Sequence, residues 1–288
     1  MRTRAVSSLG VIAVGVIAGV IGGPVFAAVM AAIGLGVYYE TSRITPLIGL
    51  GYRLEWPGYV VIFLGASISL LSQEPWSFAS FISIAVLLPT VMILQLPVSS
   101  ESFAAWITTA AVGAYVGIAV FAAIALRQEA GILDAEWAND VGTYFSVSDD
   151  SYALGMAWTA IAIVVAWLSD TFAFLVGHTM GRTPLIPHIS PKKTLEGAVG
   201  GVLGAVIGTV TLTLLLGIPD VSVAQAIVIG VVLSIVGVGG DLSESFIKRC
   251  GGVKDSGTLI PGHGGIFDRV DALLPIFLVT WVIVRILQ

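Results

Sequence analysis

The sequence predicts an all-α integral membrane protein, a polytopic bundle of about nine transmembrane helices. Of its 288 residues, 57% are apolar and only 11% are charged, and the mean hydropathy is +0.99. Apolar runs long enough to cross roughly 30 Å of hydrocarbon as helices recur along the whole chain. The alternating strands that build a membrane β-barrel do not appear.

The expected spans follow one another with mostly short connections. They cover residues 7–22, 24–40, 57–72, 77–95, 103–126, 152–177, 195–217, 222–240 and 270–287. The first is interpreted as an uncleaved helix rather than a signal peptide, because the apolar sequence resumes after Gly22-Gly23-Pro24 and lacks a convincing cleavage site. An odd number of spans places the two termini on opposite sides of the membrane.

The distribution of lysine and arginine predicts the orientation. With the N-terminus in the cytoplasm, eleven of the thirteen basic residues face the cytoplasm, and only Arg127 and Arg285 lie outside. The C-terminus is then extracytoplasmic. Residues 1–150 would hold five spans and an acidic, solvated external loop (127–151), and residues 151–288 would hold four spans and two cytoplasmic loops. We expect these two parts to form one continuous membrane domain.

Composition excludes several classes of function. The single cysteine, Cys250, excludes a disulfide framework and a cysteine-based metal cluster, and three scattered histidines lack the spacing of a zinc site. A net charge of −5 does not suggest nucleic acid binding. Two sets of glycines spaced by four line helix faces with small residues, which permits close helix packing and makes a homodimer plausible. They are Gly15, Gly19 and Gly23, and Gly200, Gly204 and Gly208.

Charge is concentrated between Gly239 and Asp271, which hold five acids, four bases and His263. If the segment from Asp241 continues as a helix, then one face at the inner end of the eighth span carries Asp241, Glu244, Ser245 and Lys248. Gly251-Gly252 would end that helix. Further on, the glycines around His263 would let backbone amides approach a ligand closely.

Three aspartates in this stretch suit a hard divalent cation. Asp268 and Asp271 are three residues apart and would share a face at the start of the ninth span, opposite Asp241 at the end of the eighth. Mg²⁺ takes oxygen ligands and usually bridges to substrate phosphates, and nearby bases would neutralise the remaining phosphate charge. The alternative is that these groups are ion pairs that cap helices at the membrane interface.

Two further elements upstream are candidates for a functional role. In Ser190-Pro191-Lys192-Lys193-Thr194, Ser190 fits a helix N-cap and Pro191 the first helical position. Both lysines would then lie in the first turn, where the helix dipole disfavours cations unless an anion such as phosphate binds there. The alternative is an ordinary positive-inside anchor. Asp170 is a carboxylate inside a long apolar run, which makes it a candidate to bind metal, to hold a lysine or to pair structurally.

These residues resemble a known family. Ser245-Phe-Ile-Lys248-Arg249, then Lys254-Asp255-Ser-Gly257, then Pro261-Gly-His-Gly-Gly-Ile-Phe-Asp268-Arg-Val-Asp271 is similar to the signature of the phosphatidate cytidylyltransferase (CDP-diacylglycerol synthase) family. The stretch from Ser190 to Gly197 and the Trp167-x-x-Asp170 pattern resemble family elements in the expected order. The resemblance covers residues 165–275, with Phe174 where the family pattern has tyrosine.

The resemblance implies that CTP and phosphatidate react to give CDP-diacylglycerol and pyrophosphate. The reaction would need Mg²⁺, with room for a second metal ion, and would occur at the cytoplasmic face of the inner (plasma) membrane. The catalytic residues would be Asp241, Lys248, Asp268 and Asp271; the three aspartates would hold metal, with Asp170 as a further candidate. Substrate binding would fall to Ser190, Lys192, Lys193, Thr194, Glu196, Ser245, Arg249, Lys254, Asp255, His263, Gly264, Gly265 and Arg269.

Two other functions compete with this one. A related CTP-dependent enzyme, such as a polyprenol kinase or an archaeal-lipid cytidylyltransferase, shares some features and would differ in its product. An ion-coupled transporter would place acids near the midplane of several spans, whereas here only Asp170 is even partly within one. The absence of an internal repeat also gives no support to an inverted-repeat transporter.

Overall fold

The computed structural model describes residues 13–48, 55–72, 74, 76–145, 152–260 and 264–288. Within these ranges the chain is mostly helical, as predicted. It divides into two compact units. The first comprises residues 1–18, 23–125 and 247–270, and the second comprises residues 19–22, 126–246 and 271–288.

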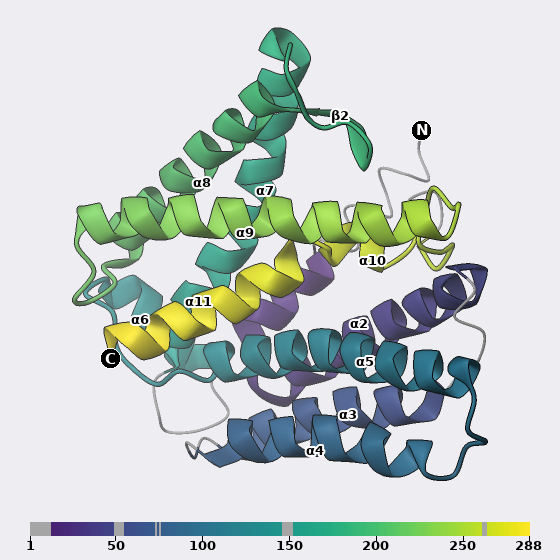
Figure 1. Ribbon diagram of the computed structural model, residues 1–288. Helices are drawn as coiled ribbons and strands as arrows, with labels where there is room; N and C mark the ends of the chain where they lie inside the picture. The colour runs from purple at the N-terminus through teal and green to yellow at the C-terminus, as the bar shows by residue number, and fades with distance from the viewer. Residues whose placement is uncertain (1–12, 49–54, 73, 75, 146–151, 261–263) are drawn as a thin grey trace. The chain divides into compact units, whose positions relative to one another are not determined.

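The first unit is built on four long helices, α2 (Gly23–Ile44), α3 (Glu55–Leu71), α4 (Trp76–Ile93) and α5 (Ser100–Arg127, whose end belongs to the second unit). A 3-10 turn, η1 (Thr45–Ile48), follows α2, and the short α10 (Phe267–Val270) joins this unit from far along the chain. Helix α3 packs against both α2 and α4 (Figure 1). Close approach needs Gly34 on α2, because a side chain there would meet Ile62 of α3 and Val120 of α5.

The second unit contains α6 (Glu136–Phe145), α7 (Ala153–Met180), α8 (Leu195–Leu216), the greater part of α9 (Val223–Cys250) and α11 (Leu273–Leu287). Two short strands, β1 (Pro184–Ile186) and β2 (Ser190–Thr194), form an antiparallel hairpin between α7 and α8. Helices α7 and α8 make the most extensive contact between any two elements (Figure 1).

The glycine stripe of α8 is used inside the chain. A side chain at Gly200 would meet Val176, and one at Gly204 would meet Phe172 and the carbonyl oxygen of Leu168. These glycines therefore let α8 lie directly against α7. This packing within one chain accounts for the spacing that had suggested a homodimer, and the homodimer stays a prediction.

Six helices in the described ranges are long and apolar enough to cross a membrane, namely α2, α4, α5, α7, α8 and α9. Shorter apolar helices cover Trp56–Leu71, within α3, and Leu273–Leu287. The first expected span is helical over residues 13–21, and its beginning lies outside the described residues. The protein is thus a multi-pass helical membrane protein, while the count of nine spans and their orientation stay predictions.

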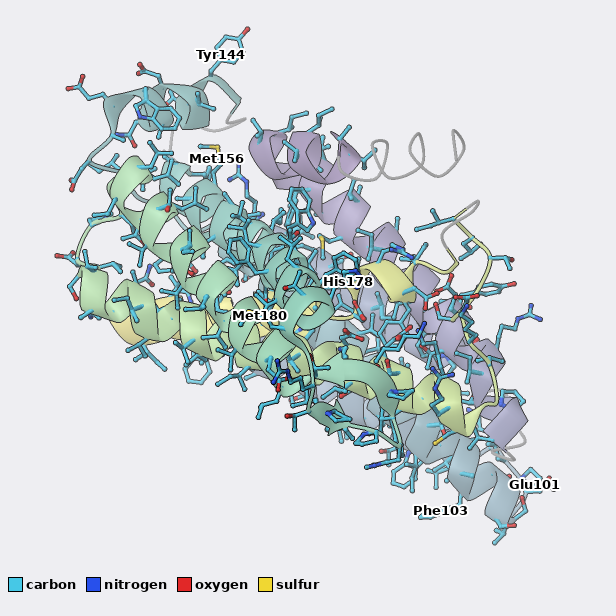
Figure 2. The ribbon with its side chains drawn as sticks, turned by 90° about the horizontal axis from the view of Figure 1, so that it is seen from above. Glu101, Phe103, Tyr144, Met156, His178 and Met180 are labelled. Carbon is cyan, nitrogen blue, oxygen red and sulfur yellow. The ribbon has the colours of Figure 1, made fainter. Side chains whose placement is uncertain are left out.

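The connections differ from expectation in two places. The segment 127–151 is not simply a solvated loop, because Glu136–Phe145 forms α6 with Ala138 buried and Tyr144 exposed (Figure 2). The expectation that Asp268 and Asp271 share one helix face is wrong, because α10 ends at Val270 and α11 begins only at Leu273. The Asp271 side chain accepts the N–H of Ala272 (2.9 Å), the local hydrogen bonding by which aspartate competes with a helix.

Candidate active site

Three carboxylates of the second unit form the carboxylate cluster, which we define as Asp241, Glu244 and Asp271. One oxygen from each lies within 4.8 Å of the others. Asp241 and Glu244 are one turn apart on α9, and Asp271 precedes α11. Gly240 makes the approach possible, because a side chain there would collide with the Asp271 carbonyl oxygen and with Pro275. The cluster therefore depends on a close contact between α9 and the start of the last helix.

The chemistry of the cluster fits a hard cation. Glu244 is 1% exposed. Burial, together with the neighbouring Asp241, raises the pKa of the Asp271 carboxyl to about 7. Three carboxylate oxygens this close repel one another unless a positive charge lies among them, and oxygen donors are the ligands that Mg²⁺ prefers. The residues present therefore fit a divalent metal ion.

A lysine already reaches this cluster. The ammonium group of Lys193, on β2, forms an ion pair with Asp241, and both side chains are partly exposed. On α9, the Ser245 hydroxyl lies 3.4 Å from the other Asp241 oxygen. Asp170 of α7 is close enough to interact electrostatically with Asp241 and Lys193. The second unit thus brings together five residues from three separately predicted elements, namely Asp170, Lys193, Asp241, Ser245 and Asp271.

The hairpin that carries Lys193 corrects the predicted helix start. Helix α8 begins at Leu195, and its N-cap is Thr194, whose hydroxyl accepts the N–H of Gly197 at 3.1 Å. Ser190 is therefore not the cap, and Lys192 and Lys193 lie in a strand rather than in the first helical turn. The helix-dipole argument for an anion at these lysines does not hold.

Glu196 anchors the same hairpin. Its carboxylate accepts the backbone N–H groups of Arg182 and Thr183, each at 3.1 Å, and the Thr183 hydroxyl at 2.9 Å. These bonds tie the beginning of the hairpin to the first turn of α8. Thr194 and Glu196 were expected to bind substrate, and that role stays a prediction. Their contacts hold β2, the strand that carries Lys193.

In the first unit, Asp268 is the centre of a second polar network. One of its oxygens pairs with Lys248 at 2.7 Å. The other accepts the backbone N–H groups of Ser256 (2.9 Å) and Gly265 (2.8 Å) and lies 2.9 Å from the Ser256 hydroxyl oxygen. Asp268 was expected to bind metal, which stays a prediction. Its contacts show it holding together the segment that follows α9.

Sequence reasoning missed a buried carboxylate in the same network. Glu40, on α2, is 1% exposed and accepts hydrogen bonds from the Ser256 hydroxyl and from the N–H groups of Ile266 and Phe267, each at 2.9 Å. The signal that could have found it is the one applied to Asp170, because a carboxylate inside an apolar run is rare without a role. Glu244 was likewise seen on the charged helix face but not chosen as a site residue.

The remaining site residues are less informative. Helix α9 continues unbroken to Cys250 and ends at Gly251-Gly252 as predicted, with Gly252 in the left-handed region at φ 66°. His263 lies outside the described residues, and the neighbouring Gly264 has φ 83°. Exposed side chains with binding roles still to be tested are Lys192, Arg249, Lys254, Asp255 and Arg269. His178 stacks on Phe174 near the Met180 end of α7 (Figure 2).

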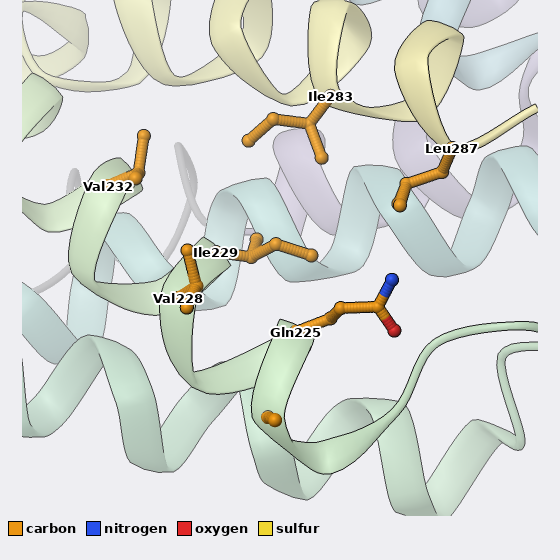
Figure 3. Close-up of a pocket in the computed structure, with 7 residues that line it drawn as sticks. Gln225, Val228, Ile229, Val232, Ile283 and Leu287 are labelled. Atoms are coloured by element: carbon orange, nitrogen blue, oxygen red, sulfur yellow. The ribbon is translucent and has the colours of Figure 1, made fainter.

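An apolar pocket of about 390 Å³ lies between α9 and α11 (Figure 3). Aliphatic side chains such as Val228, Val232 and Ile283 line it, with Gln225 as the one strongly polar side chain. Val232 precedes Asp241 by nine residues, or roughly 13 Å along a helix. An aliphatic lining offers no positive charge to the phosphates of a nucleoside triphosphate, so this pocket does not fit one.

The fold and the charged clusters define the class, a multi-pass helical membrane protein in which carboxylates and lysines are gathered by a few close helix contacts. The chain belongs to the cytidylyltransferase family, whose family model matches residues 2–287.

Individual relatives are similar over a shorter stretch. Phosphatidate cytidylyltransferase 5, chloroplastic, of Arabidopsis thaliana is 50% identical over 123 residues, which are 41% of this chain and 30% of that protein. The phosphatidate cytidylyltransferases of Staphylococcus saprophyticus and Staphylococcus aureus are 39% identical over 134 residues and 40% identical over 136 residues. In both cases the match covers 46% of this chain and 51% of the relative. The chain thus spans about half the length of these bacterial relatives and less of the plant protein.

Proposed function

We propose that this chain transfers a cytidylyl group from CTP to phosphatidate, giving CDP-diacylglycerol and pyrophosphate. The observation that carries the proposal is the carboxylate cluster with Lys193 beside it, in a chain of the cytidylyltransferase family. The names of the relatives support phosphatidate as the lipid substrate.

The reaction is a displacement at phosphorus. A phosphate oxygen of phosphatidate attacks the α-phosphorus of CTP, a new P–O bond forms, and the bond between the α-phosphorus and its bridging oxygen to the β-phosphate breaks to release pyrophosphate. Because the attacking phosphate is already an anion, no strong general base is needed. The main obstacle is the mutual repulsion of two polyanions, so positioning and charge neutralisation supply most of the catalysis.

The chain's residues divide these tasks. Asp241, Glu244 and Asp271 would hold a divalent cation, which when bound supplies positive charge to the phosphates. The metal-ligand role expected for Asp268 from the sequence stays a prediction. Lys193 would exchange its partner Asp241 for a substrate phosphate, and Lys248 and the exposed Arg249 and Arg269 would add further positive charge.

The membrane placement belongs to the same proposal. Nine spans with a cytoplasmic N-terminus would put the segment after α9 and the β1–β2 hairpin at the cytoplasmic face of the inner membrane. CTP is available there, and phosphatidate presents its head group at the bilayer surface. Six membrane-length helices and the predominance of basic residues in the expected cytoplasmic segments support this arrangement.

The decisive experiment incubates the purified protein with labelled CTP, phosphatidate and Mg²⁺. We expect a cytidine-bearing lipid and one pyrophosphate per lipid formed. A kinase would instead release CDP and leave no cytidine on the lipid, and an archaeal-lipid cytidylyltransferase would need an ether lipid as acceptor. If neither cytidine-bearing lipid nor pyrophosphate forms from phosphatidate, the proposal fails.

A further inference from the structure

The side-chain carboxylate of Glu40, on α2, accepts hydrogen bonds from residues that follow α9 in the chain. Its Oε1 accepts the N–H of Ile266, and its Oε2 accepts the N–H of Phe267 and the hydroxyl of Ser256. Ser256 and Phe267 are themselves buried. One carboxylate therefore joins Ser256 to Ile266 and Phe267, which lie on either side of residues outside the described ranges.

Two glycines fit this carboxylate closely. A side chain at Gly257 or at Gly265 would collide with the carboxylate group of Glu40. Both glycines thus approach Glu40 at backbone distance, which only glycine allows. The buried carboxylate and the two glycines therefore fit one another, and a side chain at either glycine would break the contact.

The contact continues to the ion pair of the same unit. The Ser256 hydroxyl that donates to Glu40 also lies 2.9 Å from Asp268, and the Gly265 N–H donates to Asp268. Asp268 in turn pairs with Lys248. A shift of Ser256 or Gly265 would therefore move Asp268, the acceptor that orients the lysine.

We propose that Glu40 is a positioning residue for cytidylyl transfer. It fixes Ser256 and residues 265–267 and, through them, the Lys248–Asp268 pair. The inference rests on the proposed function, and it gives the N-terminal helices a part in the reaction. Positioning effects of this kind are large, because a displacement of about 1 Å costs roughly 100-fold in rate.

The test compares Glu40→Gln with Thr41→Ala. The amide that replaces the carboxylate keeps the size of the side chain but offers one acceptor oxygen in place of two. Thr41 is the matched control, because it is the buried neighbour on α2 and its hydroxyl donates to Val37 of its own helix. Hydrogen exchange at the amides of Ile266 and Phe267 is followed together with kcat, the KM for CTP and the melting temperature.

We expect exchange at these two amides to rise at least roughly 10-fold in Glu40→Gln and kcat to fall roughly 10- to 100-fold, with melting temperatures similar in the two variants. Unchanged exchange would disprove the tether, and faster exchange with the kinetics of Thr41→Ala would disprove the positioning role. If Glu40→Gln does not fold, Glu40→Asp replaces it, and loss of the fold in both would make Glu40 purely structural. If the wild-type protein makes no cytidine-bearing lipid, the proposed function fails, and amide exchange still decides the tether.

Discussion

Asp271 lies in an environment that is unfavourable for a charged carboxylate. Burial and a neighbouring carboxylate both disfavour its charged form and raise its pKa to about 7. A bound cation is expected to stabilise the charged form of this carboxyl. The role assigned to the carboxylate cluster can therefore be tested one side chain at a time.

The first prediction concerns Asp271→Asn. The amide keeps the shape but removes the charge, so we expect the Mg²⁺ concentration for half-maximal rate to rise. We also expect kcat/KM to fall roughly 100-fold or more, which corresponds to a loss of about 3 kcal/mol or more of charge stabilisation. The measurement is the rate of transfer against Mg²⁺ concentration. Asp220→Asn is the control, because Asp220 is exposed at φ 60°, a conformation that asparagine tolerates. A variant with wild-type activity at limiting Mg²⁺ would rule out Asp271 as a ligand.

The second prediction decides the third ligand. Glu244 belongs to the carboxylate cluster, whereas Asp268 is occupied by Lys248, Ser256 and Gly265. We therefore expect Glu244→Gln to shift the Mg²⁺ dependence and Asp268→Asn to lower kcat with little shift. Direct binding of Mn²⁺ to both variants is the measurement that separates ligand loss from lost positioning. The reverse pattern would restore Asp268 as the ligand.

Individual residues show why the sequence predicted part of the site. Asp241, Ser245 and Lys248 could be placed on one face because they lie on one helix, where spacing determines direction. Glu40 could not be connected to Phe267 in this way, because 227 residues separate them. Contacts that depend on tertiary packing leave no local pattern, and the one sequence signal that could have found Glu40 is the cost of an acid in an apolar run.

At the scale of elements, the start of α8 shows two local rules in competition. Ser190-Pro191 has the form of a helix start, but proline is equally suited to an edge strand. Thr194 provides a cap to Gly197, and Glu196 holds the preceding hairpin through Arg182 and Thr183. Together these two residues satisfy the backbone N–H groups of Gly197, Arg182 and Thr183, and the helix begins after Thr194.

The third prediction tests this cap. Thr194→Ala removes the acceptor for the Gly197 N–H and should lower stability by about 1 kcal/mol. Ser190→Ala, in β2, should change stability by less than about 0.5 kcal/mol. Thermal unfolding of both variants in the same detergent provides the comparison. A larger loss for Ser190→Ala would mean that the helix begins where the sequence had placed it.

The fourth prediction concerns the contact between α7 and α8. A methyl group at Gly204 would meet the Leu168 carbonyl oxygen and the Phe172 ring, so Gly204→Ala should destabilise by about 1–3 kcal/mol. Gly239→Ala is the control, because an added Cβ there has nothing within 4 Å and alanine favours a helix. It should leave the melting temperature unchanged or raise it. Equal effects of the two substitutions would show that the α7–α8 contact does not need its glycines.

At the scale of the whole molecule, the two units divide the signature between them. Residues 247–270 belong with α2 to α5, whereas Asp241 and Asp271 belong with α7, α8 and α11. The sequence analysis described residues 1–150 and 151–288 as parts of one continuous membrane domain, and that description stays a prediction. Hydropathy reports where the chain is apolar, and it carries no information about which helices pack together. The helical class was therefore predictable and the grouping of helices was not.

Orientation in the membrane is the last prediction, and the chain carries its own probe. Cys250 is its single cysteine and is exposed at the end of α9. A cytoplasmic end of α9 predicts that a membrane-impermeant maleimide labels Cys250 in inside-out vesicles and not in intact cells. The converse control is Cys250→Ser combined with Asp140→Cys, which places the thiol on α6, in the segment expected outside. That variant should be labelled in intact cells. Labelling of Cys250 from outside would contradict the positive-inside assignment, because the basic residues around α9 would then face away from the cytoplasm and from its supply of CTP.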